Sequence, residues 1–149
     1  DGVTNWLSTE IGRPIAADVV ESYFERIDLP AGDRLYAQGD PADTIDFVAV
    51  GTVAMMLELG SGQRLCVRRS SRQTVTGEMG FFRNAKRSTN VIAERPTIVY
   101  SLSRTSFERL RQERPEIHDG LLTFIIRVLS DRLDTATGEL SAMRYVDIE

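Results

Sequence analysis

A glutamate and an arginine nine positions apart, Glu78 and Arg87, are the residues of this chain best suited to hold a small charged ligand. The segment from Thr76 to Val91 reads TGEMGFFRNAKRSTNV. A glycine followed by helix-tolerant residues predicts a single helical turn, whose free backbone N–H groups would point at one anionic phosphate. Arg87 would close that seat, because a guanidinium presents a planar fork of donors that matches phosphate oxygens.

Glu78 requires a partner of its own, because a carboxylate beside a phosphate is repulsive unless it holds something else. A ribose 2′-hydroxyl donates to a carboxylate, and the nearby Arg87 compensates the charge. The pattern predicts a site for a cyclic phosphate joined to a sugar. The alternative is a purely structural ion pair between Glu78 and Arg87 on an exposed turn. The candidate binding residues are Gly77, Glu78, Met79, Gly80, Arg87, Ser88 and Thr89.

The secondary structure expected around this segment changes along the chain from a helix to strands and back to helices. Apolar residues between Ile15 and Ile27 recur at a three-four spacing, which predicts a helix over about residues 15–28, before Pro30. Short runs rich in Val, Ile, Thr and Phe, separated by glycines, then predict a β-barrel over about residues 32–102. The expected strands are 34–37, 45–50, 52–59, 63–69, 90–93 and 97–102.

Helical periodicity returns after residue 102. Ser103 can cap a helix that Pro115 stops or restarts, and a longer helix then runs on beyond Gly138, so that helices occupy about residues 103–144. The expected fold is mainly β with flanking helices: a jelly-roll (double-stranded β-helix) barrel with an N-terminal helix and a C-terminal helix pair, as one domain over residues 1–149.

Composition narrows the function classes. A net charge of −4 argues against binding a nucleic acid backbone, which depends on clustered positive charge. Four arginines, Arg64, Arg68, Arg69 and Arg72, are expected to be solvated charges that steer an anion. No apolar run of roughly eighteen residues and no leader is present, so we expect no membrane insertion and a cytoplasmic setting.

Neither a metal site nor catalysis is expected. Cys66 has no second thiol to pair with and is expected to be a buried strand residue. His118, the single histidine, has no second histidine or nucleophile signal beside it and is expected on the surface. Phe81 and Phe82 are expected in the core, and Trp6 is expected to pack against the barrel or a neighbouring domain.

The motif resembles a known family. Gly77-Glu78-Met79-Gly80, followed by Arg87-Ser88, is similar to the phosphate-binding cassette of cyclic-nucleotide-binding domains, including those of the bacterial catabolite activator protein and protein kinase A regulatory subunits. The segments upstream at residues 30–35, 38–43, 45–48 and 51–53 resemble the opening strands and turns of the family and extend the likeness to about residues 15–135. The resemblance implies that Glu78 binds the ribose 2′-hydroxyl, that Arg87 binds the cyclic phosphate, and that no cofactor is required.

Two departures from the family leave the base open. Lys86 stands where many relatives have proline, and Ser88 stands where many kinase subunits have alanine. The serine resembles the hydroxyl residue of the catabolite activator and of some cGMP-binding members. The implied ligand is therefore cAMP or cGMP.

A narrower likeness concerns the C-terminal part. Residues 97–103, 114–116 and 129–133 are similar to the cyclic-nucleotide-binding-like extension of some bacterial sulfate-permease-type anion transporters. The working hypothesis is a regulatory module in which nucleotide binding biases the C-terminal helices and controls an attached effector, an anion transporter being one candidate. The alternative is a degenerate domain that binds no nucleotide and serves protein–protein interaction or homodimerisation.

Overall fold

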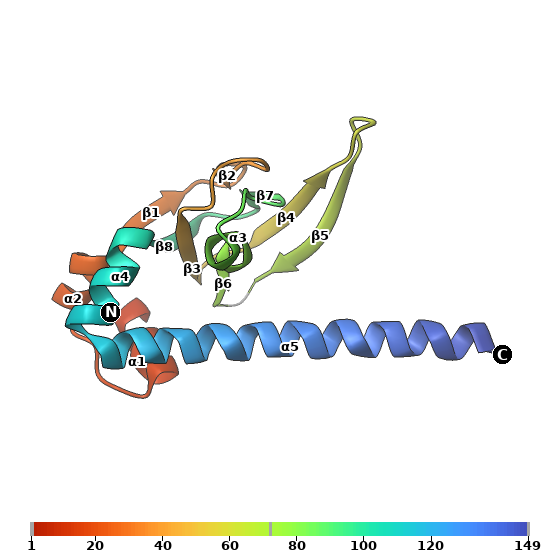
Figure 1. The fold of residues 1–149 in the computed structure, drawn as a ribbon. Coiled ribbons are helices and arrows are strands. Elements are labelled where there is room, and N and C mark those ends of the chain that lie inside the picture. The colour runs from red at the N-terminus through yellow and green to blue at the C-terminus, as the bar shows by residue number, and fades with distance from the viewer. Residues whose placement is uncertain (1, 72, 149) are drawn as a thin grey trace.

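Two four-stranded antiparallel sheets form the centre of the protein in a computed structural model that describes residues 2–71 and 73–148, with the side chains of residues 4–71 and 73–142 (Figure 1). The first sheet has the order β1 (Glu25–Leu29), β8 (Thr97–Ser103), β3 (Thr44–Val50), β6 (Thr74–Thr76). The second has the order β2 (Arg34–Tyr36), β7 (Asn90–Ala93), β4 (Val53–Glu58), β5 (Arg64–Ser70). The predicted mainly β fold is confirmed, but the sheets are not closed into a barrel, since the strands pair in two separate groups.

Strand β3 connects the hydrophobic cluster around the helices with the cluster between the two sheets. Successive side chains of a strand point to opposite faces. Phe47 packs in the cluster that contains the helices, whereas its neighbour Val48 packs between the two sheets with Val53 and Val91. All four residues are fully buried. A strand that is apolar on both faces therefore joins two hydrophobic clusters.

The N-terminal part differs from the expectation of one helix over residues 15–28. Helix α2 spans Ala17–Tyr23, and Phe24 is already extended, with φ −113° and ψ 146°. The next residues form β1, in which Ile27 pairs with Val99 of β8. The expected helix end was wrong because the apolar spacing fits a helix, while pairing with β8 decides the backbone.

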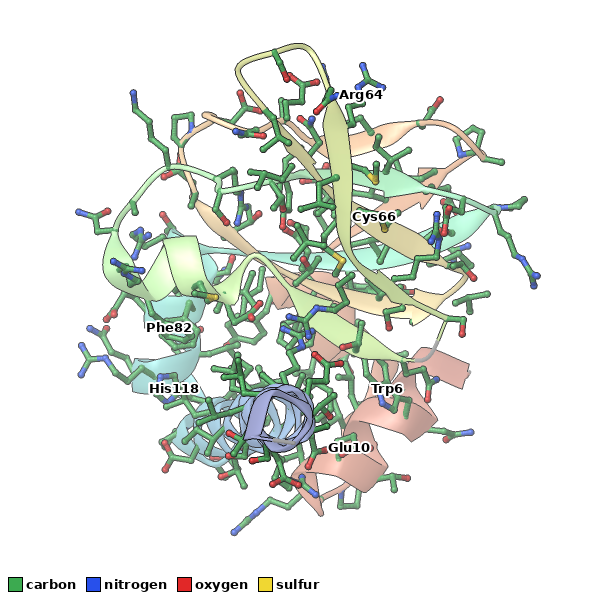
Figure 2. All side chains as sticks on the ribbon, turned by 90° about the vertical axis from the view of Figure 1, so that its right-hand side faces the viewer. Trp6, Glu10, Arg64, Cys66, Phe82 and His118 are labelled. Atoms are coloured by element: carbon green, nitrogen blue, oxygen red, sulfur yellow. The ribbon has the colours of Figure 1, made fainter. Side chains whose placement is uncertain are left out.

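Helix α1 (Gly2–Ile11) was not predicted as an element. Trp6 is buried there, and its ring meets Phe124 of the long C-terminal helix edge to face at 5.6 Å. Figure 2 looks along that helix, with Trp6 on one side and His118 on the other. Trp6 thus lies in the hydrophobic cluster that the helices share with the first sheet, and its ring contact is with α5.

The C-terminal helix pair follows the prediction. Ser103 caps α4 (Arg104–Glu113) by accepting a hydrogen bond from the backbone N–H of Ser106 at 3.1 Å. Helix α5 (Pro115–Ile148) is 34 residues long and continues beyond Gly138. Its first turns bury Leu121, Phe124 and Ile125, whereas the described side chains from Leu133 to Ala142 are all exposed. Figure 1 shows α5 continuing past the sheets.

Candidate functional site

One pocket brings together all seven residues that the sequence singled out. It lies where β5, the short helix α3 (Glu78–Arg83), the segment after it and α5 meet. Its lining consists of Tyr36, Met55, Val67, Arg68, Thr76, Gly77, Glu78, Met79, Gly80, Arg87, Ser88, Thr89 and Arg132. The assignment of these residues to a ligand stays a prediction, but their common location satisfies its geometric requirement.

The predicted helical turn is α3, and two glycines permit its position. Gly77 precedes the helix with φ +83°, and a Cβ atom there would lie 2.4 Å from Nη1 of Arg87. Gly80 lies inside the turn, where a Cβ would come within 2.7 Å of the Cβ of Ala42. Only glycine therefore fits both the left-handed backbone at 77 and the close approach of this turn to its surroundings.

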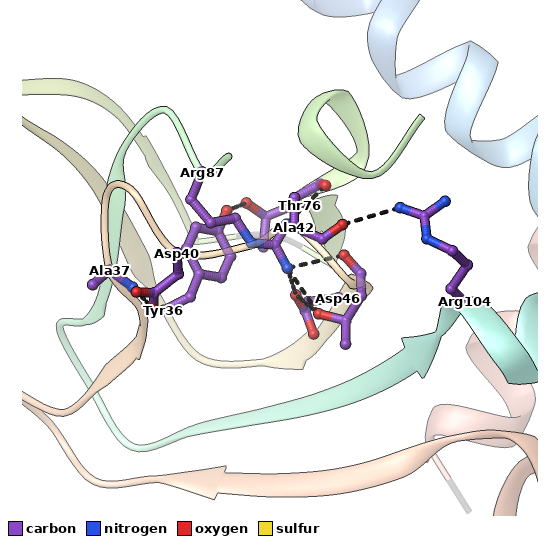
Figure 3. Close-up of polar contacts among 10 residues, drawn as sticks. Tyr36, Ala37, Asp40, Ala42, Asp46, Thr76, Arg87 and Arg104 are labelled. Carbon is purple, nitrogen blue, oxygen red and sulfur yellow. Dashed lines mark hydrogen bonds and ion pairs between the residues drawn. The ribbon is translucent and has the colours of Figure 1, made fainter. Parts of the chain in front are cut away.

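Arg87 is held from several directions beneath the pocket (Figure 3). Its Nη1 donates to the backbone oxygen of Gly77 at 2.9 Å, and its Nη2 donates to the backbone oxygen and hydroxyl of Thr44 at 3.0 and 2.8 Å. Asp46 Oδ2 lies 3.5 Å from Nη2, and the guanidinium stacks over the Tyr36 ring at 4.0 Å. These contacts fix the plane of the guanidinium.

Two of the five N–H groups of Arg87 are left over, the Nε–H and the second N–H of Nη1. The Nε atom is buried and has no hydrogen-bond partner among the described residues. An unsatisfied buried N–H costs about 1–3 kcal/mol, more for a charged group. Because Arg87 lines the pocket, a ligand acceptor there would lie beside an arginine that has N–H groups to spare.

Burial shapes the protonation of the groups around Arg87. The pKa of Asp46 is raised chiefly by burial, although hydrogen bonds from Ser101 and Thr44 and the charge of Arg87 act in the other direction. Burial likewise raises the pKa of Tyr36 to about 12, and its hydroxyl and that of Thr76 are 2.9 Å apart. Tyr36 therefore stays neutral near pH 7.

Glu78 and Arg87 do not form the ion pair that was the structural alternative. Arg132 of α5 instead donates from Nη1 to Glu78 Oε1 at 2.8 Å. Its Nη2 donates to the hydroxyl of Thr74 at 3.1 Å and the backbone oxygen of Val75 at 2.6 Å. The Glu78 side chain is only 4% exposed. The long helix is thus tied directly to the first residue of α3.

The remaining predicted site residues lie at the edge of the pocket. Met79 is 56% exposed, Ser88 is exposed and Thr89 is half-buried. These side chains leave the mouth of the pocket open to a ligand and supply two hydroxyl groups there.

Several contact residues were missed as site residues. Asp46 had a sequence signal, because an acidic residue inside the apolar run IDFVAV needs a partner when the strand is buried. Arg132 belongs to α5, and no local pattern indicates that this helix returns to the cassette. Tyr36 and Thr44 are brought to Arg87 only by the pairing of strands.

Three expectations for single side chains need correction. His118 is 6% exposed rather than on the surface, because its ring packs against the ring of Phe107, with 4.7 Å between the ring centroids. Phe81 is in the core as predicted, whereas Phe82 is 46% exposed. Cys66 is only half-buried, because β5 is an edge strand with mostly exposed residues.

The four arginines that were expected to be solvated differ in their surroundings. Arg64 and Arg69 pair with Glu58 and Glu94 as exposed ions. Arg68 lines the pocket, and its side chain has no hydrogen-bond or ion-pair partner in the described part of the chain. Arg72 lies outside the described residues.

Within residues 2–71 and 73–148, no helix is both long enough and apolar enough to span a membrane. Within the same ranges, His, Cys, Asp and Glu side chains form no group of three or more that could hold a metal ion.

Comparison with known proteins finds a family and several relatives. A family model described as "Cyclic nucleotide-binding domain" matches residues 26–114. A CRP-like cAMP-activated global transcriptional regulator of Mycobacterium tuberculosis is 23% identical over 135 residues, which cover 91% of this chain and 58% of the regulator. A cAMP-dependent protein kinase regulatory subunit of Yarrowia lipolytica is 26% identical over 131 residues, 85% of this chain and 33% of the subunit.

Solved structures agree on the fold. The crystal structure of a cyclic nucleotide-binding domain from Methylobacillus flagellatus superposes with a TM-score of 0.78 at 18% identity, covering 95% of this chain and 86% of that one. The chain spans less than two thirds of the length of the two regulators described above.

Proposed function

Because the chain belongs to the cyclic nucleotide-binding domain family, we propose that it binds cAMP or cGMP in the pocket beside α3 and that occupancy regulates an attached effector. The phosphate is held by Arg87, and the ribose 2′-hydroxyl donates to Glu78. Ser88 and Thr89 add hydroxyl donors at the open edge, and the glycines at 77 and 80 allow the close approach of the backbone.

The observation that carries this proposal is the buried Nε of Arg87, which has no acceptor among the described residues. The arginine lines the pocket, and three of its four terminal N–H groups already donate to Gly77 and Thr44. A phosphate oxygen supplies the missing acceptor and an opposite charge together. A charge-assisted bond of this kind is about twice as strong as a neutral one.

Glu78 connects occupancy to α5. A carboxylate has about four acceptor positions, so a ribose hydroxyl can bind Glu78 beside Arg132. The nucleotide then acts on the same carboxylate that ties α5 to the cassette. Regulation requires that two arrangements of α5 differ in nucleotide affinity, because a ligand shifts a conformational equilibrium only by its differential affinity.

Isothermal titration calorimetry of nucleotide-free protein with cAMP and cGMP tests the proposal. Wild type is expected to bind one of them with a Kd in the micromolar range or tighter. Arg87→Lys keeps a positive charge opposite Asp46 but removes Nε and the planar fork, so affinity should fall by about tenfold or more. Arg95→Lys is the matched control, because Arg95 is exposed and does not line the pocket.

Equal affinities of wild type and Arg87→Lys would place the ligand elsewhere. Absence of binding by folded wild-type protein to either nucleotide would overturn the proposal and favour the non-binding interaction module.

The nature of the effector is part of the same proposal. The likeness of residues 97–103, 114–116 and 129–133 to extensions of sulfate-permease-type transporters supports an anion transporter as one candidate. A cytoplasmic setting follows from an intracellular messenger as ligand. A non-catalytic role is supported by His118, whose ring contacts Phe107 and whose Nδ1 lies 3.0 Å from Asp119, so the histidine is engaged outside the pocket lining.

A second candidate function, homodimerisation, is favoured by an apolar repeat on α5. Ile126, Leu133 and Leu140 are seven residues apart and are 61%, 69% and 66% exposed. At 3.6 residues per turn they share one face, roughly opposite Leu121 and Phe124, which face the core. A seven-residue apolar repeat is the seam by which two copies of one helix pack as a coiled coil. The occupant of this face is therefore a second copy of the chain.

Sedimentation equilibrium tests the dimer. Wild type should sediment as a dimer and Leu133→Glu as a monomer, because a charge at the seam is desolvated only on association. Leu65→Glu, at another exposed leucine on β5, should stay dimeric. A monomeric wild type at tens of micromolar, or a dimeric Leu133→Glu, would contradict this role of α5.

A further inference from the structure

Two groups of elements line the pocket. Arg87 and Glu78 belong to the segment proposed for the phosphate and ribose, whereas Met55 belongs to β4 and Val67 and Arg68 belong to β5. A nucleotide anchored by its phosphate and ribose leaves its base to contact the β4–β5 residues. Met55 and Val67 offer apolar contacts to a ring, but neither side chain can hydrogen-bond to the base edge.

An irregularity in strand pairing directs this part of β5 toward the pocket. Met55 pairs with Arg68, and the next residue of β4, Met56, pairs with Cys66. Val67 is therefore an extra residue opposite this position, a β-bulge. Bulges redirect side chains and occur next to binding sites. The bulge explains how the consecutive residues Val67 and Arg68 both line one pocket, although neighbours in a regular strand point to opposite faces.

Arg68 is the arginine of β5 whose side chain has no acceptor. Arg64 and Arg69 of the same strand both have glutamate partners. The side chain of Arg68 has no hydrogen-bond or ion-pair partner in the part of the chain that the structure describes, and Arg68 also borders the groove between β5 and α5. Partial burial and the charge of Arg132 lower the pKa of Arg68, although the charge of Glu78 acts in the other direction. An acceptor-rich group in the pocket would relieve both effects.

We propose that Arg68 selects guanine, so that the preferred ligand of the pocket is cGMP rather than cAMP. This inference rests on the proposed function. Guanine presents two acceptors, O6 and N7, on one edge, and a guanidinium binds them with two parallel bonds. Adenine presents N7 beside an amino donor, which opposes an arginine that can only donate. The hydroxyl groups of Ser88 and Thr89 both donate and accept, so they do not impose this choice.

The test compares three nucleotides by calorimetry: cGMP, cAMP and cyclic inosine monophosphate, which has O6 and N7 but lacks the 2-amino group. Wild type should bind cGMP and the inosine analogue about tenfold more tightly than cAMP. In Arg68→Gln the ratio should fall toward one, because glutamine can pair with adenine through N6 and N7. Arg69→Gln is the matched control on the same strand and should keep the wild-type ratio.

The ratio of the cGMP affinity to the cAMP affinity separates recognition of the base from simple charge attraction, which the affinity for one nucleotide does not. A loss of affinity in Arg68→Gln that is equal for all three nucleotides would reduce Arg68 to an electrostatic role and overturn the inference. Equal binding of cAMP and cGMP by wild type would also overturn it while leaving the proposed function intact. If wild type binds none of the three, the proposed function itself fails, and the inference fails with it.

Discussion

Two arginines border the pocket in different ways. Arg87 is 5% exposed and is bound by Asp46, Thr44 and the backbone of Gly77, groups that belong to the sheets and the turn before α3. Arg132 is 18% exposed and reaches from α5 across to Glu78 and the strand β6. The first arginine is fixed within the sheet framework, whereas the second joins two elements that are far apart in sequence.

This difference assigns different roles to the two ion pairs. Breaking the Arg87 contacts leaves a buried charge on Asp46, so the scaffold and the binding site fail together. Breaking the Arg132 contacts also leaves a buried carboxylate, on Glu78, and detaches a helix from it, but the contacts that hold Arg87 stay in place. We therefore expect nucleotide affinity to depend mainly on Arg87, and communication with α5 to depend on Arg132.

The largest expected effect is that of Arg87→Ala. Removal of one partner from a buried ion pair costs about 3–5 kcal/mol, and we expect a loss of unfolding free energy of this order in urea denaturation, together with loss of nucleotide binding. Adding Asp46→Ala to this variant should recover part of the lost stability, because the unpaired carboxylate is removed. If Arg132→Ala abolishes nucleotide binding as Arg87→Ala does, the contrast between the two arginines is wrong.

Alkaline pH probes the Arg87 region through Tyr36. Burial raises the pKa of Tyr36 to about 12 from its ordinary 10.0, so the folded protein retains a proton that the unfolded chain loses. The resulting stability is complete below pH 10 and is lost as the pH rises to 12, by about 2–3 kcal/mol. Tyr36→Phe should lack this part of the pH dependence. The comparison is made by urea unfolding between pH 8 and pH 11.5, and identical slopes for both proteins would contradict the prediction.

A pair of glycine substitutions separates backbone strain from displacement of Arg87. Gly77 and Gly62 both have φ +83°, but an added Cβ meets Arg87 at position 77 and no atom within 4 Å at position 62. Gly77→Ala should therefore be about 1–2 kcal/mol more destabilising than Gly62→Ala. Thermal or urea unfolding measures the difference. Equal losses would mean that Arg87 moves aside without cost and is less firmly held than its contacts indicate.

The smallest expected effect on affinity is that of Arg132→Gln. Nucleotide affinity should stay within about fivefold of wild type, about 1 kcal/mol, because Arg87 remains in place. Hydrogen exchange of the α5 amides should no longer respond to nucleotide, since the connection through Glu78 is weakened. A response of α5 that persists in the variant would show that occupancy reaches the helix by another route.

The sequence predicted which candidate residues lie together better than it predicted the elements around them. The segment from Gly77 to Thr89 is local: its glycines predict a turn, and all seven candidate residues line one pocket. The C-terminal helices were also predictable, because Ser103 and Pro115 are local signals for where helices begin.

Most of the features that the sequence did not predict depend on contacts between distant parts of the chain. Residues 25–29 resemble a helical continuation, and only β8 shows that they form a strand. The same holds for Arg132, whose partner Glu78 lies 54 residues away, and for Asp46, which reaches Arg87 through the sheets. The predicted closure of the sheets into a barrel, which the structure does not show, was wrong for the same reason. Closure depends on which strand edges pair with each other, and no single strand indicates this.

The most direct test of the account is an NMR titration that follows the Arg87 Nε–H resonance, assigned by its absence in Arg87→Lys. Binding of cyclic nucleotide should shift this resonance downfield strongly and saturably, because a buried donor without an acceptor gains a phosphate oxygen. The resonances of exposed arginines such as Arg95 should stay unchanged. If nucleotide binds at saturation and the Arg87 Nε–H resonance does not move, the phosphate is held elsewhere and the central claim is wrong.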